Sequence, residues 1–185
     1  MAQNEPSSDH ALSQASPDLL AVLESAARLK ELVPDAVLVG GSAAYDRDHV
    51  VADLRGRFDM VLEALESEGE WVTNRVRPGK VILGQLGDIE AGVRQMIRTR
   101  PLETAEIALP SGRSLCVPTA EETLRIKGFL IVRRNQTRDY LDVAALADRY
   151  GVDAAAAVLA AIDAACLGAW PSARLDLKRV TIRSE

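Results

Sequence analysis

The sequence predicts an α+β fold, in which a small mixed β-sheet is flanked by helices and followed by a C-terminal helical bundle. Two observations support this class. Short runs of β-branched residues alternate with amphipathic stretches in the first two thirds of the chain, and helical spacing of apolar residues dominates the remainder. We expect a disordered N-terminal tail at 1–15, an α/β core at 16–118, and a helical module with its tail at 119–185.

The composition limits the class of protein. The chain has 185 residues, of which 48% are hydrophobic and 26% charged, and a net charge of −5. These values are ordinary for a globular domain and argue against a protein that mainly coats nucleic acid. Cys116 and Cys166 lack metal-ligand spacing, so we expect neither a disulfide framework nor a zinc site. The polar N-terminus and the lack of an apolar run of about 18 residues predict a cytoplasmic protein without a membrane partner.

A helix and two strands are predicted to open the core. Ser16 is a suitable N-cap, Pro17 suits the first helical position, and a wide apolar stripe continues to Leu32. The run AVLVGG at 36–41 is typical of an interior strand, and HVVADL at 49–54 of the end of another strand.

Further elements follow from periodicity and turn residues. Phe58 and the apolar residues after it predict an amphipathic helix at 57–67. EWVTNRV and KVILGQL read as paired strands around Pro78-Gly79, and AEIALPSGRSLCVP reads as a hairpin at 105–118. Thr119 and Glu122 form a capping box at the start of the helical module. Its helices are expected at about 119–134, 137–150 and 153–167.

In the stretch GQLGDIEAGVRQ at 84–95, two acidic residues follow the predicted strand KVILGQL. Asp88 and Glu90 within it offer a weak candidate for an additional carboxylate in a site. Arg94 and Arg98, four residues apart, are expected on a solvated face.

A glycine turn and an acidic pair are the first chemical motif. Gly40, Gly41 and Ser42 end the first predicted strand, and glycines let backbone amides approach a phosphate closely. Asp46 and Asp48 stand at i and i+2, so an extended strand would direct both carboxylates to one face, where Mg²⁺ is the usual cation between them. The alternative is that the glycines form an ordinary turn and the two aspartates lie on a solvated strand edge. Because the aspartates follow closely after the glycine turn, we prefer the metal site.

The helical module adds a second motif. Lys127 lies among apolar residues, so its ammonium either extends to solvent or finds an anion such as a nucleotide phosphate. An acidic pair at i, i+3, Asp139 and Asp142, is preceded and flanked by three arginines; these are Arg133, Arg134 and Arg138. The group forms either an ion-paired helix start, with Arg138 reaching Asp142, or a basic rim for a triphosphate or an RNA backbone.

In this order the motifs resemble nucleotidyltransferase-fold proteins of the AbiEii type, which are toxins of bacterial toxin–antitoxin and abortive-infection systems. The resemblance rests on VGGSA at a strand end, the Asp46-x-Asp48 pair and the run VPTAEETLRIKGFLIVRRNQTRDYLDVAAL at 117–146, and it covers roughly residues 18–150. It implies a mixed sheet of about five strands. It also implies Mg²⁺-assisted transfer of a nucleoside monophosphate from an NTP to an RNA or protein acceptor, with an antitoxin protein as a possible partner.

The resemblance implies a role for each matched position. The glycine turn would hold the triphosphate, and the acidic pair would ligate the metal and act in catalysis. Residues of the helical module would contact the nucleotide, and Lys127 among them would also act in catalysis. The matched residues are Gly40, Gly41, Ser42, Asp46, Asp48, Lys127, Arg134 and Asp139.

One feature departs from the family pattern. About ten residues, mostly a helix, usually separate the glycine turn from the acidic pair, but four do so here, and four residues span at most ~14 Å. Either a compact loop still brings the turn to the carboxylates, or the protein is a catalytically degenerate module that binds a nucleotide or a partner. A purely structural interaction protein is the third reading, and it explains the acidic pair least well.

Overall fold

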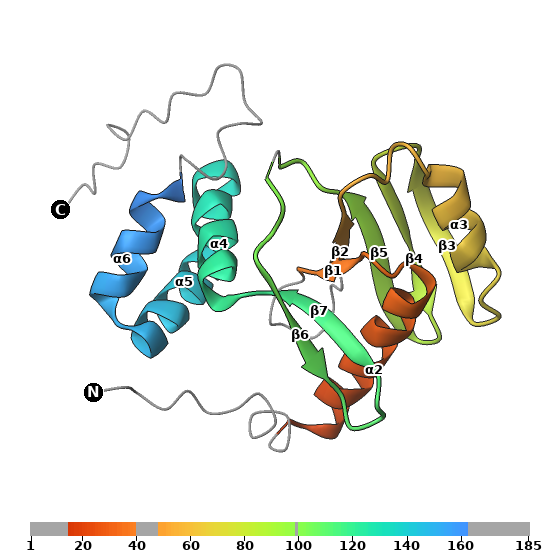
Figure 1. The fold of residues 1–185 in the computed structure, drawn as a ribbon, viewed down its shortest axis with the longest axis horizontal. Helices are drawn as coiled ribbons and strands as arrows, with labels where there is room; N and C mark the ends of the chain where they lie inside the picture. Colours follow the sequence, from red (N-terminus) through yellow and green to blue (C-terminus); the bar gives the residue numbers. More distant parts are fainter. Residues whose placement is uncertain (1–14, 40–47, 99, 163–185) are drawn as a thin grey trace.

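The computed structural model describes residues 15–39, 48–98 and 100–162 and confirms the α+β class (Figure 1). Its strands are β1 (Val37–Leu38), β2 (Asp48–Val51), β3 (Trp71–Arg77), β4 (Val81–Leu86), β5 (Ile89–Gln95), β6 (Thr104–Ala108) and β7 (Ser114–Pro118). Its helices are α2 (Pro17–Leu32), α3 (Phe58–Glu66), α4 (Ala120–Arg134), α5 (Thr137–Tyr150) and α6 (Val152–Ala160). The expectations for the glycine turn and for Asp46 lie outside the described residues.

The main sheet has five strands in the order β1-β2-β5-β4-β3. The pair β2 and β5 is parallel and the other pairs are antiparallel, so the sheet is mixed, as expected. Strand β5, which lies at the centre of the sheet, was not predicted from the sequence. Ala91 and Gly92 weaken its strand signal in the sequence, but ladders on both sides hold it in place.

The predicted interior strand at 36–41 is described only as β1, which has two residues and lies at the edge of the sheet. It pairs with β2 alone within this sheet, through Val37 opposite Val50 and Leu38 opposite His49. The apolar run therefore marks a strand, but apolar character alone did not reveal its position in the sheet.

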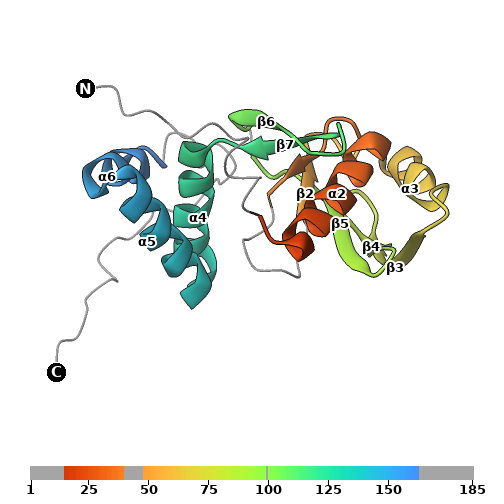
Figure 2. The ribbon, with the colours of Figure 1, turned by 90° about the horizontal axis from the view of Figure 1, so that it is seen from below.

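Among the described residues, the helices that pack on the sheet lie on the face that carries the core; the opposite face is called the open face. Helices α2 and α3 pack on the first face, where the largest buried side chains of the core lie; these are Leu29, Leu54, Leu65, Ile82, Val33, Val51 and Val93. Side chains alternate along a strand, so Asp48, Gly92 and Arg94 belong to the other face. In Figure 2 the two helices lie above β3, β4 and β5, so the open face points downward.

Helix α2 begins as the sequence predicts. The Ser16 hydroxyl accepts a hydrogen bond from the Leu19 amide at 3.2 Å, and Pro17 is the first helical residue. On its other side, α2 packs against the separate β6–β7 hairpin through Ala26 and Ala27, whose small side chains permit close approach. The helix therefore joins the two β units into one body.

The helical module begins immediately after β7, and α4 is its helix nearest the sheet in both views (Figures 1 and 2). The Thr119 hydroxyl accepts a hydrogen bond from the Glu122 amide, which confirms one half of the capping box. The other half is wrong, because the Thr119 amide donates to the backbone carbonyl of Glu103 and the Glu122 carboxylate binds arginines instead.

Asn135, with φ 50°, ends α4, and α5 ends before Gly151, as expected. Within the described ranges, none of the helices combines the length and the apolar composition needed to cross a lipid bilayer.

Replacing Gly84 with alanine should destabilise the sheet. A Cβ at this position would lie 2.4 Å from the Trp71 ring and 2.6 Å from the Val72 carbonyl oxygen. Trp71 is itself held, because its indole donates to the Thr73 hydroxyl at 2.9 Å. We expect Gly84→Ala to lower the free energy of unfolding by about 2 kcal/mol in urea titrations.

Gly69→Ala is the matched control, because nothing lies within 4 Å of its added Cβ. Equal stability of the two variants would show that the packing of Trp71 on the Gly84 backbone is not tight.

Candidate functional site

The predicted site residues fall into three groups. Gly40, Gly41, Ser42 and Asp46 lie outside the described residues, so their roles stay predictions. Asp48 lies at the start of β2. The third group, on α4 and α5, consists of Lys127, Arg134 and Asp139.

Asp48 directs its carboxylate over the open face toward β5. In the parallel register, Asp48 lies opposite Gly92, and Arg94 is two residues further along β5 on the same face. A Cβ at Gly92 would lie 3.2 Å from Asp48 Oδ1 and 2.7 Å from Leu83 Cδ2. Glycine at this position therefore leaves the space that the carboxylate occupies.

Arg94 forms an ion pair with this carboxylate. Its Nε lies 2.7 Å from Asp48 Oδ1, and both atoms are shielded from water. The rest of the guanidinium is more accessible, since 41% of the Arg94 side-chain surface is exposed, against 21% for Asp48. The expectation of a solvated Arg94 is thus wrong at Nε, while its outer part still faces solvent.

The donor set does not by itself fit a divalent cation. Mg²⁺ takes six oxygen ligands and is usually held by one or two carboxylates with waters and phosphates. In the described ranges, no group of three or more His, Cys, Asp or Glu side chains could hold a metal, and the Asp48 oxygen nearest β5 already contacts a guanidinium. Glu90 shares the open face but is exposed, so the predicted Mg²⁺ site depends on Asp46.

Lys127 forms a salt bridge with a carboxylate of the same helical module. The side chain is 8% exposed, and Nζ lies 2.5 Å from Asp142 Oδ2. This salt bridge between α4 and α5 compensates for the desolvation of the buried ammonium. The low exposure of the side chain excludes the alternative, in which the ammonium extends into solvent. A contact between Lys127 and a nucleotide stays a prediction.

Arg134 and Asp139 form a second pair, at the turn between α4 and α5. Arg134 Nε and Nη2 donate to the two carboxylate oxygens at 2.7 and 2.8 Å, a bidentate arrangement. Asp139 is fully buried, and the hydrogen bonds from Arg134 hold its pKa below the ordinary 3.8, against the opposing effect of burial. These two predicted nucleotide-binding residues therefore bind each other and fix the start of α5.

A third ionic cluster fastens the module to the sheet. Arg98, just after β5, binds the fully buried Glu122 carboxylate on α4, which corrects the expectation that Arg98 is solvated. Arg125 lies 2.9 Å from the other Glu122 oxygen and 2.9 Å from Glu103 Oε2. No local sequence pattern predicted this cluster, since its members come from three separate segments.

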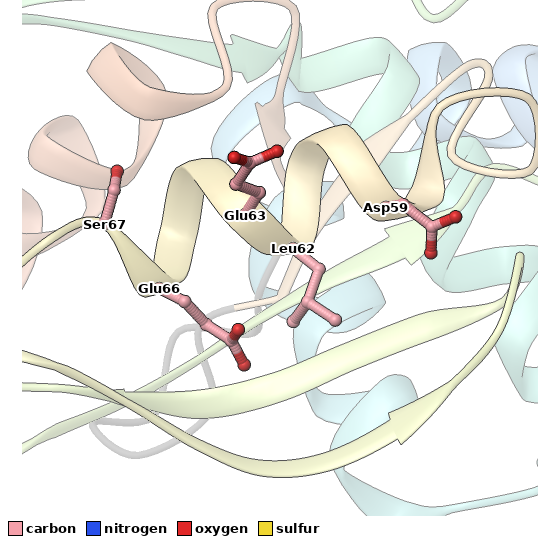
Figure 3. A pocket seen from close by; sticks show the side chains of 5 residues that line it. All are labelled: Asp59, Leu62, Glu63, Glu66 and Ser67. Carbon is pink, nitrogen blue, oxygen red and sulfur yellow. The ribbon is translucent and has the colours of Figure 1, made fainter.

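A hollow of about 360 Å³ lies along α3 and does not coincide with the Asp48 region. It is lined by residues of α3 and the turn after it, including three carboxylates (Figure 3); these residues are Asp59, Leu62, Glu63, Glu66 and Ser67. Because α3 covers the face of the sheet opposite Asp48, this hollow adds nothing to the candidate site.

Comparisons with known proteins identify the fold. No family model matches the chain. It is similar to two structures of the antibiotic-resistance factor ANT(2'')-Ia. The solution structure has a TM-score of 0.52, with 79% of this chain and 91% of that chain covered. The crystal structure with adenylyl-2''-tobramycin has a TM-score of 0.54, with 79% and 97% covered. Sequence identity is 11% for both, so the shared feature is the nucleotidyltransferase fold.

The relatives that are similar in sequence are transport, uptake or export proteins. The chain is 34% identical over 181 residues to the probable transport protein MmpL11 of Mycobacterium bovis and to the heme uptake protein MmpL11 of Mycobacterium tuberculosis, which covers 80% of this chain and 17% of each relative. It is 30% identical to the mycolic acid-containing lipids exporter MmpL11 of Mycolicibacterium smegmatis, with 91% and 18% covered. The chain thus spans less than a fifth of the length of these relatives.

Removing the Asp139 charge should destabilise the protein in a pH-dependent manner. Asp139→Asn leaves Arg134 facing a neutral amide at a buried position, so we expect a loss of roughly 3 kcal/mol of unfolding free energy at pH 7. Because the pKa of Asp139 is lowered in the folded state, its contribution is complete above about 3.8 and falls as the pH drops through the lower folded-state value.

Urea unfolding at pH 7 and at pH 3 measures both effects, and Asp148→Asn, at an exposed position of the same helix, is the control. A difference between the native protein and Asp139→Asn that grows from pH 7 to pH 3 would contradict the sign of the pKa shift.

Proposed function

We propose that this protein binds a nucleoside triphosphate on the open face of its sheet and transfers a nucleoside monophosphate to an acceptor. The observation that carries the proposal is the Asp48 carboxylate, which the nucleotidyltransferase fold presents at the start of β2, beside a guanidinium with exposed surface. Nucleotidyl transfer depends mainly on position and on cationic charge beside the phosphate oxygens. Arg94 supplies one such charge at this position.

In this proposal the residues before β2 complete the phosphate site. Gly40, Gly41 and Ser42 would contact the triphosphate through backbone amides and a hydroxyl, and Asp46 would stand beside Asp48. Lys127, Arg134 and Asp139 would contribute from the helical module. In the described structure two of these three, Arg134 and Asp139, are bound to each other, so their proposed role is to position α4 and α5 around the nucleotide.

The finer form of the proposal is an AbiEii-type toxin that modifies RNA or protein in the cytoplasm with Mg²⁺. The support is the run at 117–146 together with the glycine turn. Co-expression with the product of an adjacent regulatory gene tests this form, because an antitoxin should restore the growth of cells that the chain alone inhibits. If strong expression of the chain leaves cell growth unaltered, the toxin hypothesis is rejected, whereas the proposal of nucleotidyl transfer remains.

A second candidate is a nucleotide-binding or partner-binding module without catalysis. Two observations favour it: the Asp48 carboxylate is already paired with Arg94, and the chain matches less than a fifth of much longer transport proteins. In that case the chain would respond to a nucleotide, or bind a larger assembly, without transferring label.

Labelled NTPs distinguish the two candidates. The purified chain is incubated with each α-labelled NTP, with and without Mg²⁺, and with total RNA or cell protein as acceptor. We expect label transfer that falls about 100-fold in Asp48→Asn, because the carboxylate beside the reacting phosphate is lost.

Asp59→Asn, on α3 and outside the proposed site, should leave transfer unchanged. Nucleotide binding that persists in Asp46→Ala and Asp48→Ala, with no transfer by any form, would favour the binding module. No binding and no transfer under any condition would remove both candidates.

A further inference from the structure

The position of Asp48 is fixed by three contacts on the open face. Its strand pairs in parallel with β5, Gly92 leaves space for the carboxylate, and Arg94 holds Oδ1 at 2.7 Å. Leu83 closes the same space from β4, since its Cδ2 would lie 2.7 Å from a Cβ at Gly92. The carboxylate is therefore seated against a guanidinium by the backbone arrangement of neighbouring strands.

This arrangement conflicts with a metal ion at the same oxygen. Asp48 Oδ1 and Arg94 Nε are both shielded from water, so a divalent cation at Oδ1 would have to displace the guanidinium from a desolvated contact. Arginine remains protonated at all accessible pH values, so the guanidinium cannot leave Asp48 Oδ1 by losing a proton.

The same guanidinium is suited to a second anion. Its Nε lies in the ion pair with Asp48 Oδ1, whereas 41% of the side-chain surface is exposed. Arginine presents five N–H donors in a planar fork, so the remaining donors match the geometry of phosphate oxygens.

We propose that Arg94 is the resident cation of the site: it occupies the place that a divalent metal would take at Asp48 Oδ1 and binds the polyphosphate of a nucleotide directly. Nucleotide binding by this chain would then be independent of Mg²⁺. The nucleotide part rests on the proposed function, whereas the exclusion of metal from Asp48 Oδ1 does not.

Two measurements on the full chain test the inference separately. Mn²⁺ binding without nucleotide is followed by electron paramagnetic resonance, and binding of a fluorescent ATP analogue is followed by anisotropy in EDTA and in MgCl₂. For the native protein we expect no saturable Mn²⁺ binding below about 1 mM, where weak carboxylate sites begin, and analogue affinities within about twofold in the two buffers.

Arg94→Gln should separate the two roles. It should weaken analogue binding in EDTA about tenfold, or ~1.4 kcal/mol, and should permit Mn²⁺ binding by removing the guanidinium from Asp48 Oδ1. Arg94→Lys keeps the charge and should retain most of the binding in EDTA. Arg77→Gln is the matched control, because Arg77 lies in the same cross-strand row, opposite Val81, which in turn pairs with Arg94.

Saturable micromolar Mn²⁺ binding by the native protein would overturn the inference, as would Arg94→Gln leaving both measurements unchanged. An equal loss of affinity in Arg77→Gln would also contradict it, because the effect would then come from general charge. If no form binds the analogue, the proposed function fails, and the Mn²⁺ results for the native protein and Arg94→Gln still decide the metal question.

Discussion

The contact between Asp48 and Arg94 determines what chemistry the open face of the sheet can support. It depends on the parallel pairing of β2 with β5 and on Gly92, where a side chain would press on the carboxylate. The counter-charge of Asp48 therefore comes from β5, a strand that is not part of the sequence motif around Asp48. A site built in this way begins with its negative charge neutralised, and this favours an incoming anion over an incoming metal ion.

The helical module is organised by ion pairs of its own. Lys127 with Asp142 and Arg134 with Asp139 join α4 to α5, while Arg98 and Arg125 on the buried Glu122 join α4 to the segment after β5. Breaking one partner of such a buried pair usually costs more than the pair contributes, because a charge is left without compensation. These contacts therefore specify how the module sits beside the sheet.

Local signals in the sequence predicted most of the elements but not their long-range pairing. Ser16, Pro17 and Gly151 marked helix ends correctly because capping depends on neighbours in the chain. The central strand β5 was missed, because ladders to distant strands, not its own Ala-Gly pattern, stabilise it. For the same reason the sequence could identify Asp48 as a candidate but not Arg94 as its partner, nor choose Asp142 as the anion for Lys127.

Fold and sequence similarity support different parts of the account. The fold is that of nucleotidyltransferases, whereas the relatives in sequence are transport proteins of which the chain matches less than a fifth.

The most direct test of the central claim is a ¹⁵N NMR titration with ATP in EDTA that follows the Arg94 side-chain Nε–H and the Gly92 amide. The account predicts that both signals shift in a saturable manner without divalent metal. Signals that stay in place, or that move only after Mg²⁺ is added, would contradict it.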